Sequence, residues 1–197
     1  MTVSDSGGPI CPITLSGGTG SCTGTPSILI GGLAAVGTRT ITATYGGDLT
    51  FKGSSGFKNQ QVIYNFNGFL SPLKLSSFSG SFNFGKTVPI KWQLQTYTGA
   101  YITLSNLDLT KVSLTAFFNG QPINGVCPVS PVSSKVLILF NSIQGAAGGS
   151  TFRYDSTNNQ YIFNYDTSKA NFGTGCYTVS LITGDGSAPK VTSYLLK

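Results

Sequence analysis

The sequence predicts an all-β chain folded as antiparallel β-sandwiches. Polar and apolar residues alternate along many short stretches, whereas long stretches with the 3.6-residue period of a helix do not occur. Pairs of glycine and asparagine residues separate these stretches, as expected for the turns of β-hairpins. Many short strands joined by such turns are typical of a β-sandwich.

The composition agrees with this prediction. Hydrophobic residues make up 40% of the 197 residues, which is enough for a sizeable core, and charged residues only 9%. An average globular protein has about 25% charged residues, so Ser, Thr, Asn and Gln must supply most of the polar surface. With 13 Phe, 9 Tyr and 1 Trp, the chain is too rich in aromatic residues for a disordered protein.

Strands are expected where alternation is clearest. Their shared apolar faces are Ile41, Ala43 and Tyr45 in 40–45; Val62, Tyr64 and Phe66 in 62–66; Ile90, Trp92 and Leu94 in 89–95; Tyr161, Phe163 and Tyr165 in 160–165; and Tyr177, Val179 and Leu181 in 176–182. The uniformly apolar stretch 136–140 is expected to be a buried strand. Strands with one polar face form antiparallel sheets.

Turns and a domain boundary follow from the residues between these strands. The clearest hairpin spans 152–165, with a polar tip at Ser156–Asn159. Pro122, Pro128 and Pro131 mark a long loop around Cys127. The polar segment 57–61 is the best candidate boundary, which divides the chain into domains 1–57 and 58–197.

Four cysteines indicate the compartment. No C-x-x-C pair is present, and without histidine a zinc site would need all four thiolates. An even number of cysteines in a β protein of low charge indicates disulfides and an oxidising compartment. Of the three possible pairings we favour the local one, Cys11–Cys22 with Cys127–Cys176, each joining neighbouring strands.

The ends of the chain and its apolar stretches bear on localisation. The first ten residues have neither the basic start nor the apolar run of a secretory signal. No apolar stretch is long enough to span a membrane. We therefore expect a piece of a longer protein that is secreted or displayed on the cell surface.

The first part of the chain contains TVSD at 2–5, the cysteines Cys11 and Cys22, and GTRTITATYGGDLTFKGS at 37–54. With these stretches, residues 2–56 resemble the bacterial immunoglobulin-like repeats of large surface proteins. Such repeats have about two further strands before the part that matches TVSD. The resemblance therefore implies an immunoglobulin-like first domain that is truncated, so that its open sheet edge would accept a strand from another chain.

A second resemblance is carried by 64–73, 85–94 with its P-x-K-W core, the region of Cys127, 152–167 and 175–187. With these stretches, residues 62–197 resemble the PxKF domain, a C-terminal β module of bacterial extracellular proteins, whereas the insert 76–84 departs from the pattern. Both families are usually spacers, stalks or tails of larger secreted proteins, and neither implies a catalytic site. The resemblances thus favour a non-catalytic structural module whose partners include other domains of its parent chain.

Little catalytic chemistry is available to this composition. Without histidine, Ser-His-Asp and Cys-His arrangements are excluded, and the six acidic residues are all Asp. A polysaccharide hydrolase would need two carboxylates about 5–9 Å apart. Asp155 and Asp166, which flank one hairpin, are the weak candidates, although turn formation explains both.

Cofactors, nucleic acid and covalent cross-links receive less support. A bound calcium ion is conceivable at Asp5 or Asp48, but isolated Asp residues are more often turn formers. Basic residues are spread singly along the chain, so no nucleic-acid partner is expected despite the net charge of +6. A Lys–Asn cross-link at Lys91 would need a buried lysine, which alternation argues against.

Carbohydrate binding is the main functional alternative. Exposed aromatic rings stack on sugar faces. Three Phe residues lie in the stretch 78–85, which we interpret as a Gly/Ser-rich loop, and two Tyr residues lie shortly after it; the candidates are Phe78, Phe82, Phe84, Tyr97 and Tyr101. The competing interpretation is that these rings close the ends of the sandwich core.

Overall fold

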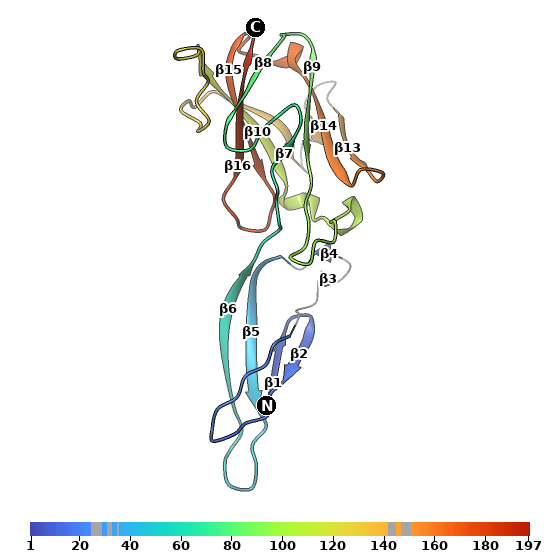
Figure 1. Ribbon diagram of the computed structural model, residues 1–197, viewed down its shortest axis with the longest axis vertical. Helices are drawn as coiled ribbons and strands as arrows, with labels where there is room; N and C mark the ends of the chain where they lie inside the picture. The colour runs from blue at the N-terminus through green and yellow to red at the C-terminus, as the bar shows by residue number, and fades with distance from the viewer. Residues whose placement is uncertain (25–28, 31–32, 35, 142–144, 147–150) are drawn as a thin grey trace. The chain divides into compact units, whose positions relative to one another are not determined.

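The computed structural model describes residues 1–24, 29–30, 33–34, 36–141, 145–146 and 151–197. The chain divides into two compact units, Met1–Ile63 and Tyr64–Lys197, which are taken separately below (Figure 1). The all-β prediction is confirmed. The helical segments of the described residues are three short 3-10 turns: η1 (Leu104–Asn106), η2 (Leu109–Lys111) and η3 (Thr167–Lys169).

The first unit contains one antiparallel sheet. Its strands lie in the order β2-β1-β5-β6, with bounds β1 Thr2–Asp5, β2 Gly8–Pro12, β5 Gly37–Tyr45 and β6 Ser54–Val62. Two further strands, β3 (Leu29–Ile30) and β4 (Leu33–Ala34), pair with each other in antiparallel fashion, apart from this sheet. As alternation predicted, β5 directs Ile41, Ala43 and Tyr45 to the same face as the buried Arg39.

The core of this unit is small. Among its described residues with assigned burial, Cys11 and Arg39 are buried, whereas Leu49, Phe51, Phe57 and Ile63 are exposed large apolar side chains. Strand β6 is exposed along its length, apart from the half-buried Val62. The first unit therefore keeps large apolar side chains in solvent, which soluble folds usually cover.

The segment 57–61 is a strand, which corrects our expectation of a linker. It lies inside β6 and pairs with β5, with Asn59 opposite Thr40. Polar pairs join the strands, since Thr38 Oγ1 donates to Gln61 Oε1 and Thr40 Oγ1 donates to Asn59 Oδ1, both at 2.9 Å. The polar composition thus marks a solvent-facing strand, and the compact units divide between Ile63 and Tyr64.

The expected strand at 62–66 does not form. Val62 ends β6 in the first unit, while Tyr64 is buried in the second unit, so the predicted shared face is divided between the units. Asn65 forms only an isolated bridge with Gln95. Alternation alone could not distinguish a strand from the short crossing segment between two units.

The second unit is a two-sheet sandwich. One sheet has the order β13-β14-β9-β7, with bounds β7 Phe69–Leu70, β9 Thr87–Trp92, β13 Thr151–Asp155 and β14 Gln160–Asp166. The other has the order β12-β11-β10-β15-β16-β8, with bounds β8 Phe78–Phe82, β10 Ser113–Gly120, β11 Val136–Asn141, β12 Gly145–Ala146, β15 Gly175–Ile182 and β16 Lys190–Leu196.

This strand order is that of an immunoglobulin-like sandwich. In the variable type, strands A, B, E and D form one sheet and strands C″, C′, C, F and G the other. The first sheet of the second unit matches A, B, E and D with β7, β9, β14 and β13. The second sheet matches C″, C′, C, F and G with β12, β11, β10, β15 and β16. The nine strands follow one another along the chain in the order A to G. The remaining strand, β8, pairs in parallel with the last strand, β16.

Aromatic side chains fill the core between these sheets. Trp92 stacks on Tyr161 with ring centroids 5.6 Å apart, and Phe140 of one sheet stacks on Phe152 of the other at 4.6 Å. The predicted inward faces of 89–95, 160–165 and 176–182 are fully buried. These predictions are confirmed. Successive side chains of a strand point to opposite faces, so every second residue is buried when one face of the strand packs on the core.

The expectation of a fully buried strand at 136–140 is wrong in part. Leu139 and Phe140 are buried, but Val136 and Ile138 are exposed. They lie on β11, which is next to the edge strand of its sheet, so its outer face meets solvent. An apolar run therefore indicates a strand without showing that both faces are covered.

The long loop around Cys127 covers the outer face of β15 and β16. Thr178 Oγ1 donates to the carbonyl oxygen of Pro128 at 2.9 Å, and Ser193 Oγ donates to that of Cys127 at 3.2 Å. Thr178 and Ser193 point away from the core, but because the loop covers them they are buried, as the core-facing residues of the same strands are.

Candidate functional site

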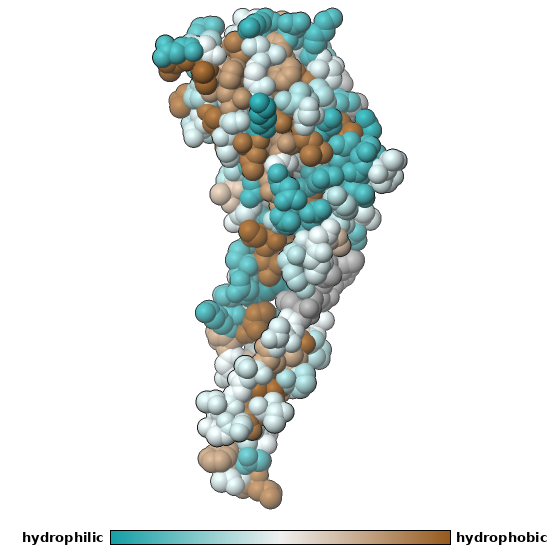
Figure 2. All heavy atoms as spheres, in the orientation of Figure 1, coloured by the Kyte–Doolittle hydropathy of each residue, from teal (hydrophilic) through white to brown (hydrophobic). Residues whose placement is uncertain are grey.

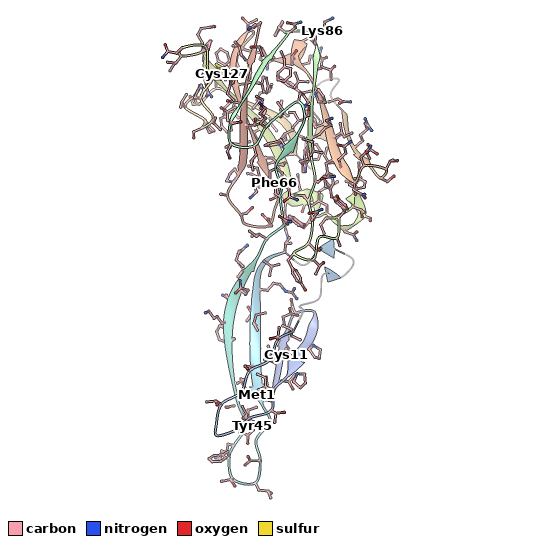
Figure 3. The ribbon with its side chains drawn as sticks, in the orientation of Figure 1. Met1, Cys11, Tyr45, Phe66, Lys86 and Cys127 are labelled. Atoms are coloured by element: carbon pink, nitrogen blue, oxygen red, sulfur yellow. A yellow bond between two sulfur atoms is a disulfide. The ribbon has the colours of Figure 1, made fainter. Side chains whose placement is uncertain are left out.

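Both predicted disulfides are present. Cys11 bonds to Cys22 in the first unit, and Cys127 bonds to Cys176 in the second; Cys11 and Cys127 are labelled in Figure 3. The expected link between neighbouring strands is wrong, because Cys22 and Cys127 lie outside strands. Each bond instead fastens a loop to a strand, β2 or β15, and the second holds the covering loop on its sheet.

The structure does not bring Asp155 and Asp166 together. Asp155 ends β13 opposite Gln160, and Asp166 lies at the far end of β14, which begins with Gln160. The distance along the strand is about 20 Å at ordinary strand rise. Since glycoside hydrolysis needs carboxylates about 5–9 Å apart, this pair cannot perform it.

Both aspartates instead hold turns. Asp155 accepts hydrogen bonds from Asn158 Nδ2 at 2.8 Å and Gln160 Nε2 at 3.0 Å, which lower its pKa to about 2. Asp166 accepts from the side chain and backbone of Ser168 at the start of η3, which lowers its pKa as well. A carboxylate with a depressed pKa is a poor proton donor at neutral pH.

The two calcium candidates have protein partners of their own. Asp5 forms a buried ion pair with Arg39, so a cation there would have to displace a guanidinium. Asp48 accepts hydrogen bonds from Tyr45 Oη and from the N–H groups of Phe51 and Thr50, which lower its pKa. No group of three or more His, Cys, Asp or Glu residues suited to a metal occurs in the described part of the chain.

Sequence reasoning missed the partner of Asp5. Alternation in 39–45 already placed Arg39 on the same face as Ile41, Ala43 and Tyr45. A buried guanidinium requires a carboxylate, and Asp5 and Asp48 are the acidic residues of the first 63. That signal was enough to predict an ion pair.

Asp185, also missed, holds the beginning of the second unit. Its carboxylate accepts hydrogen bonds from Tyr64 N at 2.8 Å, Thr183 Oγ1 at 2.9 Å and Ser187 Oγ at 2.6 Å, and it is 1% exposed. Burial raises its pKa, but the hydrogen bonds from Ser187, Tyr64 and Thr183 outweigh burial, so its pKa is lowered. Asp185 is therefore a structural anchor.

The five aromatic candidates do not form one binding platform. Phe78 and Phe82 lie on strand β8, and the Phe82 ring packs edge-on against Tyr194 at 5.6 Å. The interpretation of 78–85 as a loop is therefore wrong for these two residues. Phe84 follows β8, whereas Tyr97 and Tyr101 follow β9, so the length of β9, about 17 Å, separates them. Phe84, Tyr97 and Tyr101 are exposed.

The cross-linking lysine considered from the sequence is not buried. Lys91 is half-buried on β9, opposite Leu70 and Ile162 on its neighbouring strands. Its pairing is that of an ordinary strand residue.

The free edge of β6 is the strongest candidate for an interaction site. In the second unit the last strand, β16, is flanked by β15 on one side and by β8 on the other. In the first unit the last strand, β6, pairs with β5 and has no second partner among the described residues. Phe57, in the middle of this edge strand, is 77% exposed. An unpaired edge with an exposed aromatic side chain favours strand addition.

Comparisons with known proteins identify no family. No protein-family model matches the chain, and no curated protein matches it. Among solved structures, a chimeric titin tandem functionalised with a GRGDS peptide from fibronectin is similar over 100% of this chain and 83% of its own, with 14% identity and a TM-score of 0.34. A score this low supports no argument, so the fold assignment rests on strand order.

No helix in the described residues is long and apolar enough to cross a membrane.

Proposed function

We propose that the chain is a non-catalytic structural module of a secreted or cell-surface bacterial protein, and that its first unit self-associates through the free edge of β6. The observation that carries self-association is the contrast between the two last strands. Strand β16 has neighbours on both sides, whereas β6 is the edge of its sheet and is exposed along its length.

The strand order of the first unit supports this proposal. If the first unit is compared with an immunoglobulin-like domain, its strands β2, β1, β5 and β6 correspond to strands C′, C, F and G. In such a domain a strand of the opposite sheet, or a parallel strand like β8, can lie beside the last strand. This arrangement is consistent with the proposed assignment of the first unit as an immunoglobulin-like repeat. The proposed assignment of the second unit as a PxKF-like domain rests on the sequence resemblance.

The side chains support a structural role. The carboxylates proposed for catalysis hold turns, two disulfides fasten loops to strands, and aromatic rings fill the core of the second unit. Disulfides of this kind persist in oxidising compartments, which favours an extracellular location.

Sedimentation velocity over a wide range of protein concentrations tests self-association. The matched variants are Phe57→Lys on β6 and Phe51→Lys in the preceding turn, at residues that are 77% and 66% exposed. A charge on an edge strand opposes pairing with another strand. We expect a concentration-dependent dimer for the native chain and Phe51→Lys, and a weaker one for Phe57→Lys. A monomer at every concentration contradicts self-association.

The structural role is tested separately by mixing the protein with insoluble polysaccharides and assaying released sugar. Neither sugar release nor a dependence on Asp155 is expected. Release that is lost in the Asp155→Asn variant contradicts a non-catalytic role.

A further inference from the structure

Lysines that are far apart in the sequence meet at one end of the second unit. The carbonyl oxygen of Lys86 accepts hydrogen bonds from Thr167 N at 3.2 Å and Thr167 Oγ1 at 2.6 Å. Thr167 begins η3, the turn that ends with Lys169. The fold therefore places Lys86 and Lys169 beside each other, although most of the sandwich separates them in sequence.

Two further lysines belong to the same end. The carbonyl oxygen of Lys197 accepts from Phe84 N at 2.7 Å, and Phe84 lies two residues before Lys86. The C-terminus is marked in Figure 1 and Lys86 in Figure 3. Lys135 lies over the rings of Phe118 and Phe172, at 5.5 and 5.9 Å from their centroids, and Phe172 follows η3 closely. We call Lys86, Lys135, Lys169 and Lys197 the lysine end; all four are exposed.

The lysine end is positively charged. Asp166 is the acidic side chain beside it, bonded to Ser168 and close enough to Lys169 for that charge to lower its pKa. Asp155 and Asp185 lie toward the opposite end, at the tip of the β13–β14 hairpin and beside Tyr64. The fold thus gathers four basic residues that stand singly in the sequence. Figure 2 shows hydrophilic residues across this end.

A ring and two amides accompany the charges. Phe84 is 39% exposed; its N–H donates to the carbonyl oxygen of Lys197, and Lys86 lies two residues further along the chain. Asn83 and Asn171, both exposed, flank the same turns. Sugars are bound by an exposed ring under the sugar face with amides at the hydroxyl groups, and lysines pair with carboxylate, sulfate or phosphate groups.

We propose that the lysine end binds an acidic polysaccharide, with Phe84 stacking on a sugar ring and Lys86, Lys169 and Lys197 pairing with its acidic groups. A single-stranded nucleic acid would instead use several exposed rings for successive bases. At this end Phe118 and Phe172 are half-buried beneath Lys135, which leaves Phe84 as the exposed ring among these three. This binding activity goes beyond the structural role proposed above.

The test uses soluble polygalacturonate, which has one carboxylate per sugar, and neutral dextran of similar length. Binding is measured by calorimetry at low salt, at a protein concentration where sedimentation shows a single species. The key variant combines Lys86→Gln, Lys169→Gln and Lys197→Gln. Its control combines Lys52→Gln, Lys74→Gln and Lys111→Gln, which removes the same charge from exposed lysines elsewhere.

We expect polygalacturonate to bind and dextran not to bind. The key variant should lose about tenfold or more in affinity and the control distinctly less, because the Coulomb energy between a lysine and an acidic group falls as their separation grows. Phe84→Ala should weaken binding severalfold and leave the salt dependence unchanged, since stacking involves no ion release. Thermal unfolding of each variant confirms that it is folded.

Three results would overturn the proposal. One is the absence of polygalacturonate binding at low salt. Another is equal loss in the key and control variants, which would indicate attraction by net charge alone. The third is much tighter binding to phosphatidylglycerol vesicles or single-stranded DNA than to polygalacturonate, which would assign the lysine end to another class of partner.

Discussion

The carboxylate of Asp5 lies against the guanidinium of Arg39, with both side chains buried in the first unit. The exposed fractions are 1% for the Asp5 side chain and 4% for that of Arg39. A buried ion pair adds little net stability over apolar residues, but removing one partner leaves a buried charge uncompensated. This pair therefore determines how the first unit responds to substitution.

We predict that Asp5→Ala destabilises the first unit by about 3–5 kcal/mol. The double variant Asp5→Leu/Arg39→Met should be distinctly more stable than Asp5→Ala, because it leaves no buried charge. Hydrogen exchange of β5 amides reports the first unit alone. A double variant as unstable as the single one would show that Arg39 contributes through other contacts.

The hydroxyl group of Tyr177 fastens the corner between β14 and β15. It donates to the carbonyl oxygen of Gly173, four residues upstream, at 2.7 Å. Immunoglobulin sandwiches have a similar tyrosine corner before the same strand. Tyr194, whose ring stacks on Tyr177 at 5.9 Å, has a buried hydroxyl with no hydrogen-bond partner among the described residues.

Replacing each of these two neighbouring tyrosines by Phe gives a matched pair of variants, one with a hydrogen-bonded hydroxyl and one without. Tyr177→Phe should destabilise the second unit by about 0.5–1.5 kcal/mol, the usual contribution of one hydrogen bond. Tyr194→Phe should be neutral or stabilising because it removes a buried polar group that has no described partner. The measurement is urea unfolding followed by fluorescence of Trp92, the one tryptophan of the chain. Equal losses in both variants would argue against the corner.

The two disulfides should contribute unequally to the free energy of unfolding. The Cys127–Cys176 bond closes a sequence separation of 49 residues and the Cys11–Cys22 bond one of 11. Loop-closure entropy predicts about 4 and about 3 kcal/mol for these bonds. Replacing Cys127 and Cys176 by Ala should also uncover Thr178 and Ser193, so the loss in the second unit should be the larger. Calorimetry of each double variant checks this order.

Stability should be nearly constant between about pH 5 and 9, because the chain has neither histidine nor glutamate. Below this range, the lowered pKa values of Asp48, Asp108, Asp155, Asp166 and Asp185 matter. Each such group stabilises the fold above its unfolded pKa of about 4, and that contribution is lost as pH falls through the folded value.

Above this range the buried tyrosines control stability. Burial raises the pKa of Tyr64 and Tyr177 to about 12, and it raises those of Tyr161, Tyr165 and Tyr194 further. Their contribution is complete below the unfolded value of about 10 and decreases as pH rises toward the folded values. Urea midpoints measured from pH 2 to 12 should form a broad plateau with losses on both sides. A midpoint that changes steeply between pH 6 and 8 would contradict this account.

The sequence predicted the fold better than it predicted the sites. Alternation correctly identified the inward faces around Trp92, Phe163 and Val179, because burial follows directly from a period of two. Alternation gave the wrong prediction at 57–61, which is part of strand β6, and at Tyr64, which lies in the segment that connects the two units. A strand and a connecting segment differ here only in their tertiary pairing. The position of Phe82 against Tyr194 and the gathering of Lys86 with Lys169 depend on pairing between distant segments, which local sequence does not specify. The separation of Asp155 from Asp166 could have been predicted, because a hairpin tip at 156–159 puts Asp155 at the tip and Asp166 seven residues beyond it.

The most direct test of the central claim is hydrogen exchange of the β6 amides at low and high protein concentration. The free edge of β6 has backbone groups that face solvent in the monomer. We predict that amides within Ser54–Val62 that exchange rapidly at low concentration become protected at high concentration, and that Phe57→Lys abolishes this gain. Unchanged exchange along β6, in samples of any concentration, would contradict association through this edge.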